Sequence, residues 1–326
     1  MSENNVIHLA PRTRRSTRSK RKPQPPAGTP LNALISSWEL ALRSANKQPI
    51  TIKLYLRTAR LFAAFLEERE LPSDAEGVTA DEVRAFLVHE RERAGLSTSA
   101  SHHAYLGVFF NWLIAEEERS TFSPVLKADR PQLKRKAREY LTLAELGALL
   151  DVCKGSDFAS RRDTAIIRIF IDNGMRVGGL SGLHLDDVDL RNRRLRIRLK
   201  GGDEHWAPIG AKTAQAIDRY LRVRARLAVA GLPWLWLGIK SGRHLTKSGV
   251  QEMLERRGAQ AGVENVHPHR FRGTSAHEQL AAGAPPDVVR RVLGWKSEAM
   301  LRHYTEELAE ERAREAHAQF SPSDRL

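Results

Sequence analysis

The chain has 326 residues, of which 41% are hydrophobic, and it carries a formal net charge of +14 at pH 7. This length predicts two domains, and the apolar fraction is large enough to fill two cores. The positive charge favours a polyanionic partner, usually nucleic acid. No apolar run approaches the ~20 residues of a membrane span, and we expect no secretory signal. These features favour a cytoplasmic protein that contacts nucleic acid and has no membrane partner.

The first thirty residues are basic and rich in proline and serine. They hold seven Lys and Arg side chains against one Glu. Such a composition cannot offset the entropy of the chain by burying apolar surface, so we predict a disordered basic tail over residues 1–30. The tail would add nonspecific contacts to phosphates.

Apolar residues recur at helical spacing from residue 31 to residue 125. This pattern predicts a compact bundle of four or five helices. The expected helix starts are Leu31, Thr51, Thr79 and either Ser97 or Thr98, with Pro124 as the last stop. The aromatic residues expected to be core rather than base-stacking platforms are Phe109, Phe110, Trp112, Trp234 and Trp236.

Residues 126–139 are basic and hold few apolar side chains. A segment that merely joins two domains needs no such charge, whereas one that crosses a phosphate backbone does. We therefore predict a basic linker at 126–139 and a second domain over residues 140–326.

The second domain is predicted to be mainly helical. Thr142 and Glu145 have the spacing of a capping box. A helix that passes through Phe170 should end at Asn173-Gly174, because glycine readily adopts the left-handed conformation of a helix stop. Later helices are expected at 211–229, 246–261 and, by composition, 306–320, with a tight loop at Pro285-Pro286.

A basic hairpin is predicted in the middle of this domain. The segment 194–199 alternates between apolar and basic residues, as a strand does, and 205–209 returns after the turn Gly201-Gly202. Lys200 lies at the tip, where a flexible ammonium group can reach a leaving oxygen. The fold class is therefore mainly α with a small antiparallel β-sheet.

Several residues of this domain suit the attack of a phenolate on a phosphodiester. That reaction needs a nucleophile, positive charge at the nonbridging oxygens and an acid for the leaving oxygen. Tyr304 is the candidate nucleophile; a tyrosine hydroxyl titrates near ~10 and needs activation. Arg176 and Arg272 can clamp the phosphate and never lose their charge. His269 can hold or accept a proton near neutral pH, and Trp295 can donate a hydrogen bond from its indole.

A metal site is the alternative use of His267, His269 and His277. Their spacing near a helix start is poor for three ligands, and no acidic partner is close. The single cysteine, Cys153, excludes an internal disulfide and a thiolate cluster, and its apolar surroundings predict a core position. We therefore expect no metal and no other cofactor.

The ordered set of motifs resembles the tyrosine recombinase, or phage integrase, family, in its simple two-domain form. Gly174-Met-Arg176 is similar to the first arginine box, and Lys200-Gly201 to the hairpin lysine. His267-Pro-His269-Arg-Phe-Arg272 is similar to the second box, and Leu293-Gly-Trp295, nine residues before Tyr304, to the third. The resemblance covers about residues 31–320. Two positions depart from the pattern: Gly179 stands where an acidic residue is common, and Gly273 where a histidine often follows the second arginine.

The resemblance implies that the helical bundle of 31–125 is a core-DNA-binding domain and that 140–326 is the catalytic domain. It implies site-specific recombination of double-stranded DNA, without ATP or metal, by a homo-tetramer in which the segment 306–320 packs on a neighbouring protomer. The implied roles are a 3′-phosphotyrosyl link for Tyr304, protonation of the 5′ oxygen by Lys200, charge stabilisation by Arg176 and Arg272, proton transfer by His269 and support of the phosphate site by Trp295.

Two other readings stay open on the sequence alone. A nicking and closing enzyme similar to a type IB topoisomerase shares the chemistry without bringing two sites together. A DNA-binding accessory protein with a degenerate site would lack the chemistry. The separate helical domain and basic linker favour recombination over the first, and retention of all six candidate positions argues against the second.

Overall fold

The computed structural model describes residues 28–133, 139–198, 204–238, 243–295 and, beyond these, 297–298, 301–302, 304–306, 309, 313, 317 and 321–325. The chain divides into two compact units, Met1–Lys136 and Ala137–Leu326, which we call the N-terminal unit and the C-terminal unit. The predicted domain limits and the roles given to the domains stay predictions. Among the described residues, none of the helices has both the length and the apolar surface needed to cross a membrane.

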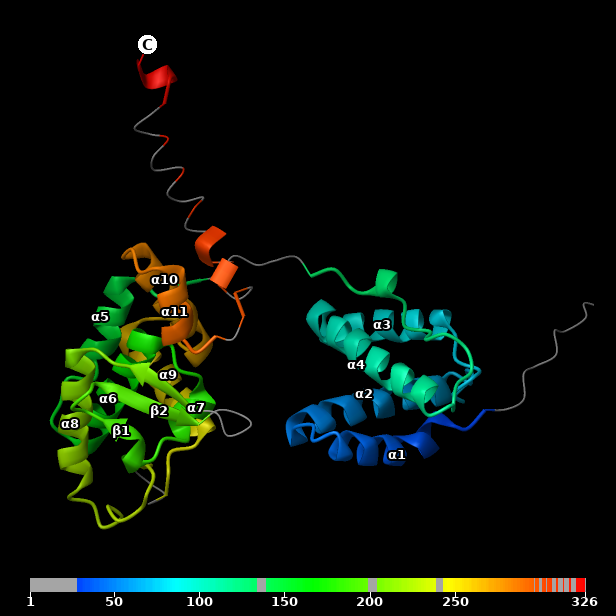
Figure 1. The fold of residues 1–326 in the computed structure, drawn as a ribbon, viewed down its shortest axis with the longest axis horizontal. Coiled ribbons are helices and arrows are strands. Elements are labelled where there is room, and N and C mark those ends of the chain that lie inside the picture. The colour runs from blue at the N-terminus through cyan, green and yellow to red at the C-terminus, as the bar shows by residue number, and fades with distance from the viewer. Residues whose placement is uncertain are drawn as a thin grey trace, which may run out of the picture. The chain divides into compact units, whose positions relative to one another are not determined.

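The N-terminal unit is a bundle of α-helices around an aromatic core (Figure 1). Trp38 packs against Phe109 with ring centroids 4.6 Å apart, and Phe62 meets Phe86 edge to face at 5.2 Å. The expected core aromatic residues of this unit are buried, except that Trp112 is half-buried at its edge. The elements are α1 (Leu31–Ser44), α2 (Pro49–Glu68), α3 (Ala80–Ala94), α4 (Leu96–Ala115) and the short 3₁₀ helix η1 (Lys127–Asp129).

Two of the expected helix starts in this unit are wrong. Helix α2 begins at Pro49 rather than at a cap on Thr51, because a proline at the first position has the right φ and needs no hydrogen bond for its nitrogen. Helix α4 begins at Leu96, directly after Gly95, whose φ of 89° turns the chain out of α3. The start at Thr79 is confirmed, with a complete capping box.

The chain before α1 is partly described. Most of the predicted tail of residues 1–30 lies outside the described residues. The carbonyl oxygen of Thr29 accepts a hydrogen bond of 2.9 Å from the nitrogen of Ala75, and Pro30 forms a β-bridge with Asp74. The ordered backbone therefore begins before Leu31.

The C-terminal unit is mainly helical with a small antiparallel sheet of order β1-β2-β3, so the predicted fold class is confirmed. Leu195 of β2 pairs with Ala207 of β3, and both side chains are buried against the core. The helices are α5 (Leu143–Asp151), α6 (Phe158–Asn173), α7 (Val177–Ser181), α8 (Ala211–Arg224), α9 (Lys247–Ala261), α10 (Pro268–Ala281) and α11 (Pro286–Val292), with the short 3₁₀ helices η2 (Leu185–Asp187) and η3 (Ser323–Arg325). The strands are β1 (Val188–Asp189), β2 (Arg194–Arg198) and β3 (Glu204–Pro208).

Several local predictions for this unit are confirmed. Thr142 and Glu145 form a capping box at α5, and α6 ends at Gly174 in the left-handed conformation. Cys153 is buried, and burial raises the pKa of its thiol to about 11. The hairpin turn of residues 199–203 and most of the predicted helix 306–320 lie outside the described residues.

Helix α8 ends five residues before the predicted limit at 229, at Arg224. The buried guanidinium group of Arg224 donates hydrogen bonds to the carbonyl oxygens of Ala230, Leu232, Trp234 and Leu235. These bonds fold the chain back over the end of the helix, so carbonyl oxygens six to eleven residues further along the chain decide where α8 stops. Trp236 is buried as predicted, whereas Trp234 is half-buried between two histidine rings.

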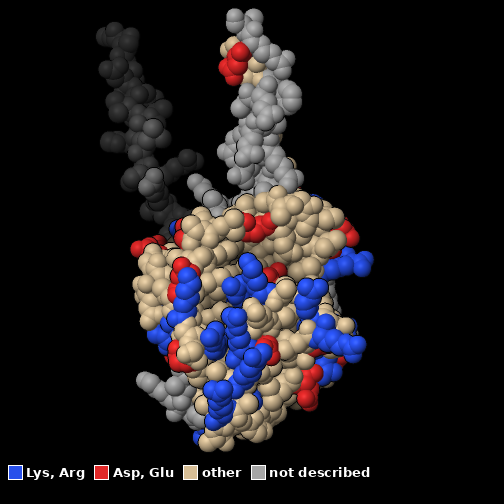
Figure 2. Space-filling view, turned by 90° about the vertical axis from the view of Figure 1, so that its left-hand side faces the viewer, with Lys and Arg blue, Asp and Glu red and all other residues tan. Residues whose placement is uncertain are grey.

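Lysine and arginine side chains gather on the face of the C-terminal unit that carries α5, α6 and α8 (Figure 2).

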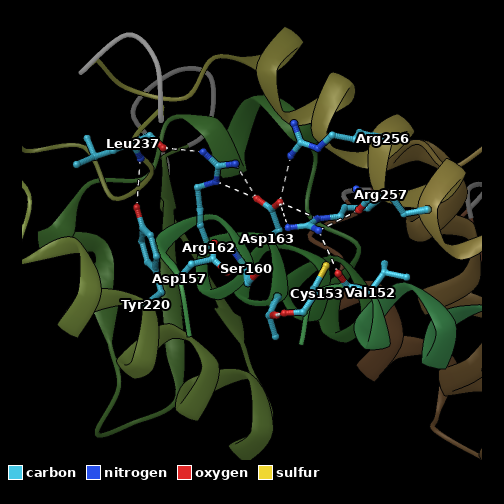
Figure 3. Close-up of polar contacts among 12 residues, drawn as sticks. Val152, Cys153, Asp157, Ser160, Arg162, Asp163, Tyr220, Leu237, Arg256 and Arg257 are labelled. Atoms are coloured by element: carbon cyan, nitrogen blue, oxygen red, sulfur yellow. Dashed lines mark hydrogen bonds and ion pairs between the residues drawn. The ribbon is translucent and has the colours of Figure 1, made fainter. Parts of the chain in front are cut away.

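Beneath the surface, a buried ionic cluster joins α6 to α9 (Figure 3). The carboxylate of Asp163 is fully buried and pairs with Arg162 at 2.7 Å, with Arg257 at 2.9 Å and with Arg256 at 3.3 Å. Arg257 also donates to the carbonyl oxygen of Val152 at 3.0 Å. One carboxylate therefore holds α9 against the start of α6.

Candidate active site

Arg272 lies at the centre of the candidate site, on the first turns of α10. Its side chain is buried, and its guanidinium group donates to the carbonyl oxygens of Gly174 at 2.7 Å and Leu293 at 2.6 Å. The same group lies 5.2 Å from the centre of the Trp295 ring. Three separate segments of the chain thus meet at one positive charge.

Gly174 makes this meeting possible. Its φ of 52° ends α6, and a Cβ at this position would stand only 2.8 Å from the Cα of Arg272. A side chain at this place would push α10 away from the end of α6. Asn173 supports the turn, since its side chain accepts a hydrogen bond from the nitrogen of Met175 at 3.2 Å and donates to the carbonyl oxygen of Pro208 at 3.2 Å.

Arg176 emerges from this turn as the residue before α7, and its side chain is exposed. Arg176 and Arg272 line a common cavity of about 240 Å³, together with Arg198 and His205 of the β-hairpin. No acidic residue is among the described residues that line it. Burial lowers the pKa of Arg272 to about 10, and the positive charge of Arg176 acts in the same direction, against the opposing effect of Tyr304. The cavity therefore carries positive charge that a bound anion would balance.

Trp295 and Tyr304 lie close to Arg272. Their rings stack with centroids 5.4 Å apart, and both side chains are buried. The ring of Tyr140 lies 6.3 Å from that of Tyr304. The indole Nε1 of Trp295 is buried and has no hydrogen-bond partner among the described residues. The predicted hydrogen-bond donor is thus a buried nitrogen without a partner among the described residues, on the ring that stacks with the candidate nucleophile.

The other two predicted site residues are His269 and Lys200. His269 is exposed on the first turn of α10 and precedes Arg272 by three residues, which places both on one side of the helix. Lys200 lies outside the described residues. Of the three histidines weighed as metal ligands, His267 instead caps α10, its side chain accepting a hydrogen bond from the nitrogen of Arg270 at 3.2 Å. No metal-binding group of three or more His, Cys, Asp or Glu occurs within the described part of the chain.

Two residues of the site were missed from the sequence. His205 faces the cavity from β3, and its position on the same strand face as the buried Ala207 was a signal that strand alternation could have provided. Tyr140 stacks on His277 with ring centroids 4.4 Å apart. No local pattern could have identified Tyr140, since its partners lie more than 130 residues away in the chain.

Gly179 and Gly273, the two departures from the family pattern, each have other side chains close to the place that a Cβ would occupy. A Cβ at Gly179 would lie 3.2 Å from a methyl group of Ile197, which occupies the space beside it. A Cβ at Gly273 would lie 3.4 Å from the ring of Tyr140 and 3.8 Å from the hydroxyl of Tyr304. Apolar and aromatic groups thus adjoin the places where the pattern commonly has an acid and a histidine.

A cationic cavity beside a phenol, with an indole donor that has no partner among the described residues, suits an enzyme that acts on phosphodiesters. The phage integrase family matches residues 139–311. The tyrosine recombinase XerC of Halalkalibacterium halodurans is 30% identical over 298 residues, which cover 88% of this chain and 97% of that protein. The tyrosine recombinase XerD of Mycobacterium tuberculosis is 31% identical over 273 residues, 78% of this chain and 86% of that protein.

Solved structures agree on the fold. The XerH site-specific recombinase bound to a palindromic difH substrate has a TM-score of 0.69 at 20% identity, covering 87% of this chain and 84% of that one. A lambda integrase tetramer bound to a Holliday junction has a TM-score of 0.66 at 17% identity, covering 85% of this chain and 77% of that one. The chain belongs to the phage integrase family and is a tyrosine-type, site-specific DNA recombinase.

Proposed function

We propose that this recombinase cuts and rejoins DNA through a phosphotyrosyl intermediate on Tyr304. The observation that carries the proposal is the arrangement around Trp295. Its ring has the Arg272 guanidinium group on one side at 5.2 Å and the Tyr304 ring stacked at 5.4 Å, while its Nε1 has no partner among the described residues. A phosphodiester bound here would meet a positive charge, a hydrogen-bond donor and a nucleophile together.

In this proposal, Arg176 and Arg272 bind the nonbridging oxygens, where negative charge increases in the transition state. The pKa of Arg272, lowered to about 10, still leaves this residue protonated at neutral pH. A fixed guanidinium pair supplies the charge that a metal ion supplies in other phosphoryl-transfer enzymes. Strand cleavage therefore needs no metal.

The bonds and protons balance within the site. The phenolic oxygen of Tyr304 forms a bond to phosphorus, and the bond from phosphorus to the 5′ oxygen breaks. The proton of the phenol passes to His269, and Lys200 gives a proton to the departing 5′ oxygen. The 3′-phosphotyrosyl link keeps the energy of the broken bond, so a 5′ hydroxyl can attack it and restore the DNA without ATP.

The substrate in this proposal is double-stranded DNA with specific recombination sites, and the active assembly is a homo-tetramer. The neighbours include XerH bound to a difH substrate and lambda integrase as a tetramer on a Holliday junction, which supports both points. Action on chromosomal DNA would place the protein in the cytoplasm, at the nucleoid. The relatives named as tyrosine recombinases favour recombination over nicking and closing and over a degenerate accessory role.

The test is covalent trapping on a nicked suicide duplex made from the DNA that flanks the gene. The parent chain should form an adduct, in EDTA as well, and Tyr304→Phe should form none while binding DNA normally. Tyr220→Phe is the matched control: Tyr220 is fully buried, donates to the carbonyl oxygen of Leu235 at 2.9 Å, and burial raises its pKa to about 12. An adduct formed by Tyr304→Phe would overturn the assignment.

A further inference from the structure

A second basic cavity lies in the C-terminal unit, away from the candidate active site. It has a volume of about 420 Å³ and is formed by α5, the segment that follows it, α6 and α8. We call it the α6–α8 pocket. Its charged and polar lining residues are Asp151, Lys154, Arg161, Thr164, Arg168, Lys212, Gln215 and Arg219. It shares no residue with the cavity of Arg176 and Arg272. In Figure 1, α5 and α8 are at the left edge of the unit and α7 at its right.

The pocket carries positive charge that the described residues do not balance. Its single acid, Asp151, pairs with Lys154 at 2.7 Å. Arg161, Arg168, Lys212 and Arg219 form no ion pair with any other described residue.

Arginines that neighbour these residues in the chain do form ion pairs. Arg162, next to Arg161, pairs with the buried Asp163 at 2.7 Å, and Arg222, one turn beyond Arg219, pairs with Asp218. Arg161 and Arg219, which line the pocket, thus lack the ion pairs that their neighbours Arg162 and Arg222 form.

The cations form two rows. Arg161 and Arg168 are seven residues apart on α6, and Lys212 and Arg219 are seven residues apart on α8. Seven residues make about two helical turns, or roughly 10 Å along each axis. A DNA strand advances about 3.4 Å per base pair, so each row spans roughly three base-pair steps.

We propose that the α6–α8 pocket binds the phosphate backbone of a DNA segment outside the recombination core. Four cations that form no ion pair with any described residue surround the cavity and match phosphate oxygens, and a recombinase works on long DNA whose flanks remain available. The contacts would be sequence-independent, since backbone phosphates carry no base information. The proposal rests on the action of this family on DNA and not on the assignment of the catalytic residues.

The test compares two variants of equal charge change in the full chain. The pocket variant is Arg168→Gln, Lys212→Gln and Arg219→Gln. The control variant is Arg191→Gln, Arg222→Gln and Arg226→Gln, three exposed residues that do not line the pocket. Affinity is measured against salt concentration on a short duplex holding only the core site and on a duplex with long flanks.

The salt slope is the slope of the logarithm of the binding constant against the logarithm of the salt concentration. Each lost phosphate contact should reduce its size by roughly 0.9, so the slope of the pocket variant on the long duplex should fall by up to about 2.7. The control variant should keep the slope of the parent there, and all three proteins should behave alike on the short duplex. Covalent trapping on the short duplex should also be unchanged, which separates this proposal from the assignment of Tyr304. An unchanged slope of the pocket variant on long DNA would overturn the proposal.

A second arm distinguishes DNA from a free anion. Titration of the parent chain with inorganic phosphate and with pyrophosphate measures ion binding directly. If the pocket variant lost phosphate binding yet kept the parent slope on long DNA, the pocket would be a site for small anions and the DNA assignment would be wrong. If the pocket variant lost its cooperative unfolding transition, the single substitution Lys212→Gln, at an exposed position, would replace it in the same test. The expected change in the salt slope is then roughly 0.9.

Discussion

The carbonyl oxygen of Gly174 accepts a hydrogen bond of 2.7 Å from the guanidinium group of Arg272, although 98 residues separate the two in the chain. This contact joins the end of α6 to the candidate phosphate clamp. It depends on a glycine, because Gly174 has a φ of 52° and stands too close to the Cα of Arg272 for a Cβ. The turn that carries Arg176 and the helix that carries Arg272 are therefore held together at this point.

Gly174→Ala should cost about 1–3 kcal/mol of stability, because it combines a strained φ with a close contact. It should also slow covalent adduct formation, since the clamp would lose its geometry. Urea unfolding and single-turnover trapping measure the two effects. Gly147→Ala, in the exposed middle of α5 with nothing near its Cβ, is the control and should stabilise the protein by up to about 1 kcal/mol. Equal behaviour of the two variants would contradict this role of Gly174.

Trp295→Phe should slow cleavage by roughly 10²-fold, because it removes one hydrogen-bond donor from the phosphate site while keeping an aromatic ring. Trp236 offers a control, since its Nε1 is also buried without a partner among the described residues, but it lies in the core of the C-terminal unit. Trp236→Phe should lose some packing and leave the rate of the chemical step unchanged. Cleavage rates at saturating DNA measure both. A normal rate for Trp295→Phe would mean that its indole only packs.

Lys200→Ala should slow cleavage by roughly 10²–10⁴-fold if Lys200 is the general acid. The defect should largely disappear on a substrate with a 5′-bridging sulfur, because a thiolate leaves without a proton. Arg176→Ala should not be rescued in this way, since Arg176 acts on the nonbridging oxygens. Cleavage rates of both variants on the oxygen and sulfur substrates measure this rescue. Equal rescue of both variants would remove Lys200 from the mechanism and make His269 the next candidate.

Asp163→Asn should destabilise the C-terminal unit by about 3–5 kcal/mol, because the buried guanidinium groups of Arg162 and Arg257 would lose their counter-charge. Asp218→Asn breaks only the exposed pair with Arg222 on α8 and should cost within about 1 kcal/mol. Chemical denaturation of both variants provides the comparison. Similar losses in the two would show that the cluster around Asp163 contributes no more than a surface pair.

The N-terminal unit should lose stability as the pH falls below ~6.5, the ordinary pKa of histidine. His102 is buried between the hydroxyl of Thr58, 2.8 Å from Nδ1, and the carboxylate of Glu90, 3.1 Å from Nε2. Burial lowers the pKa of His102 and outweighs the attraction of Glu90. The unfolded chain therefore takes up a proton first, and stability present above the unfolded pKa is lost as the pH falls toward the folded value.

Hydrogen exchange of α4 amides between pH ~7.5 and ~5 should show this loss, and His102→Gln should weaken it. An unchanged pH dependence in His102→Gln would assign the effect to another group.

Local patterns predicted much of the secondary structure because the forces involved are local. The capping boxes at Thr79 and Thr142 and the stop at Gly174 depend on hydrogen bonds and dihedral angles within a few residues. Two of the errors arose from local features that apolar periodicity does not show. Pro49 begins its helix two residues before the polar residue expected to cap it, because proline suits the first position. Helix α8 stops at Arg224, whose guanidinium group bonds to carbonyl oxygens six to eleven residues further along the chain.

The sequence by itself indicated the reaction class, because the order and spacing of Arg176, Lys200, His269, Arg272, Trp295 and Tyr304 resemble those of the tyrosine recombinase family. The tertiary structure decided which of them meet. It brought Arg272 against Gly174 and Leu293, stacked Tyr304 on Trp295 and added His205 and Tyr140 to their surroundings. It also gathered the unpaired cations of α6 and α8 around one pocket. Such contacts join residues far apart in the chain, and their geometry depends on how whole helices pack, which no local periodicity encodes.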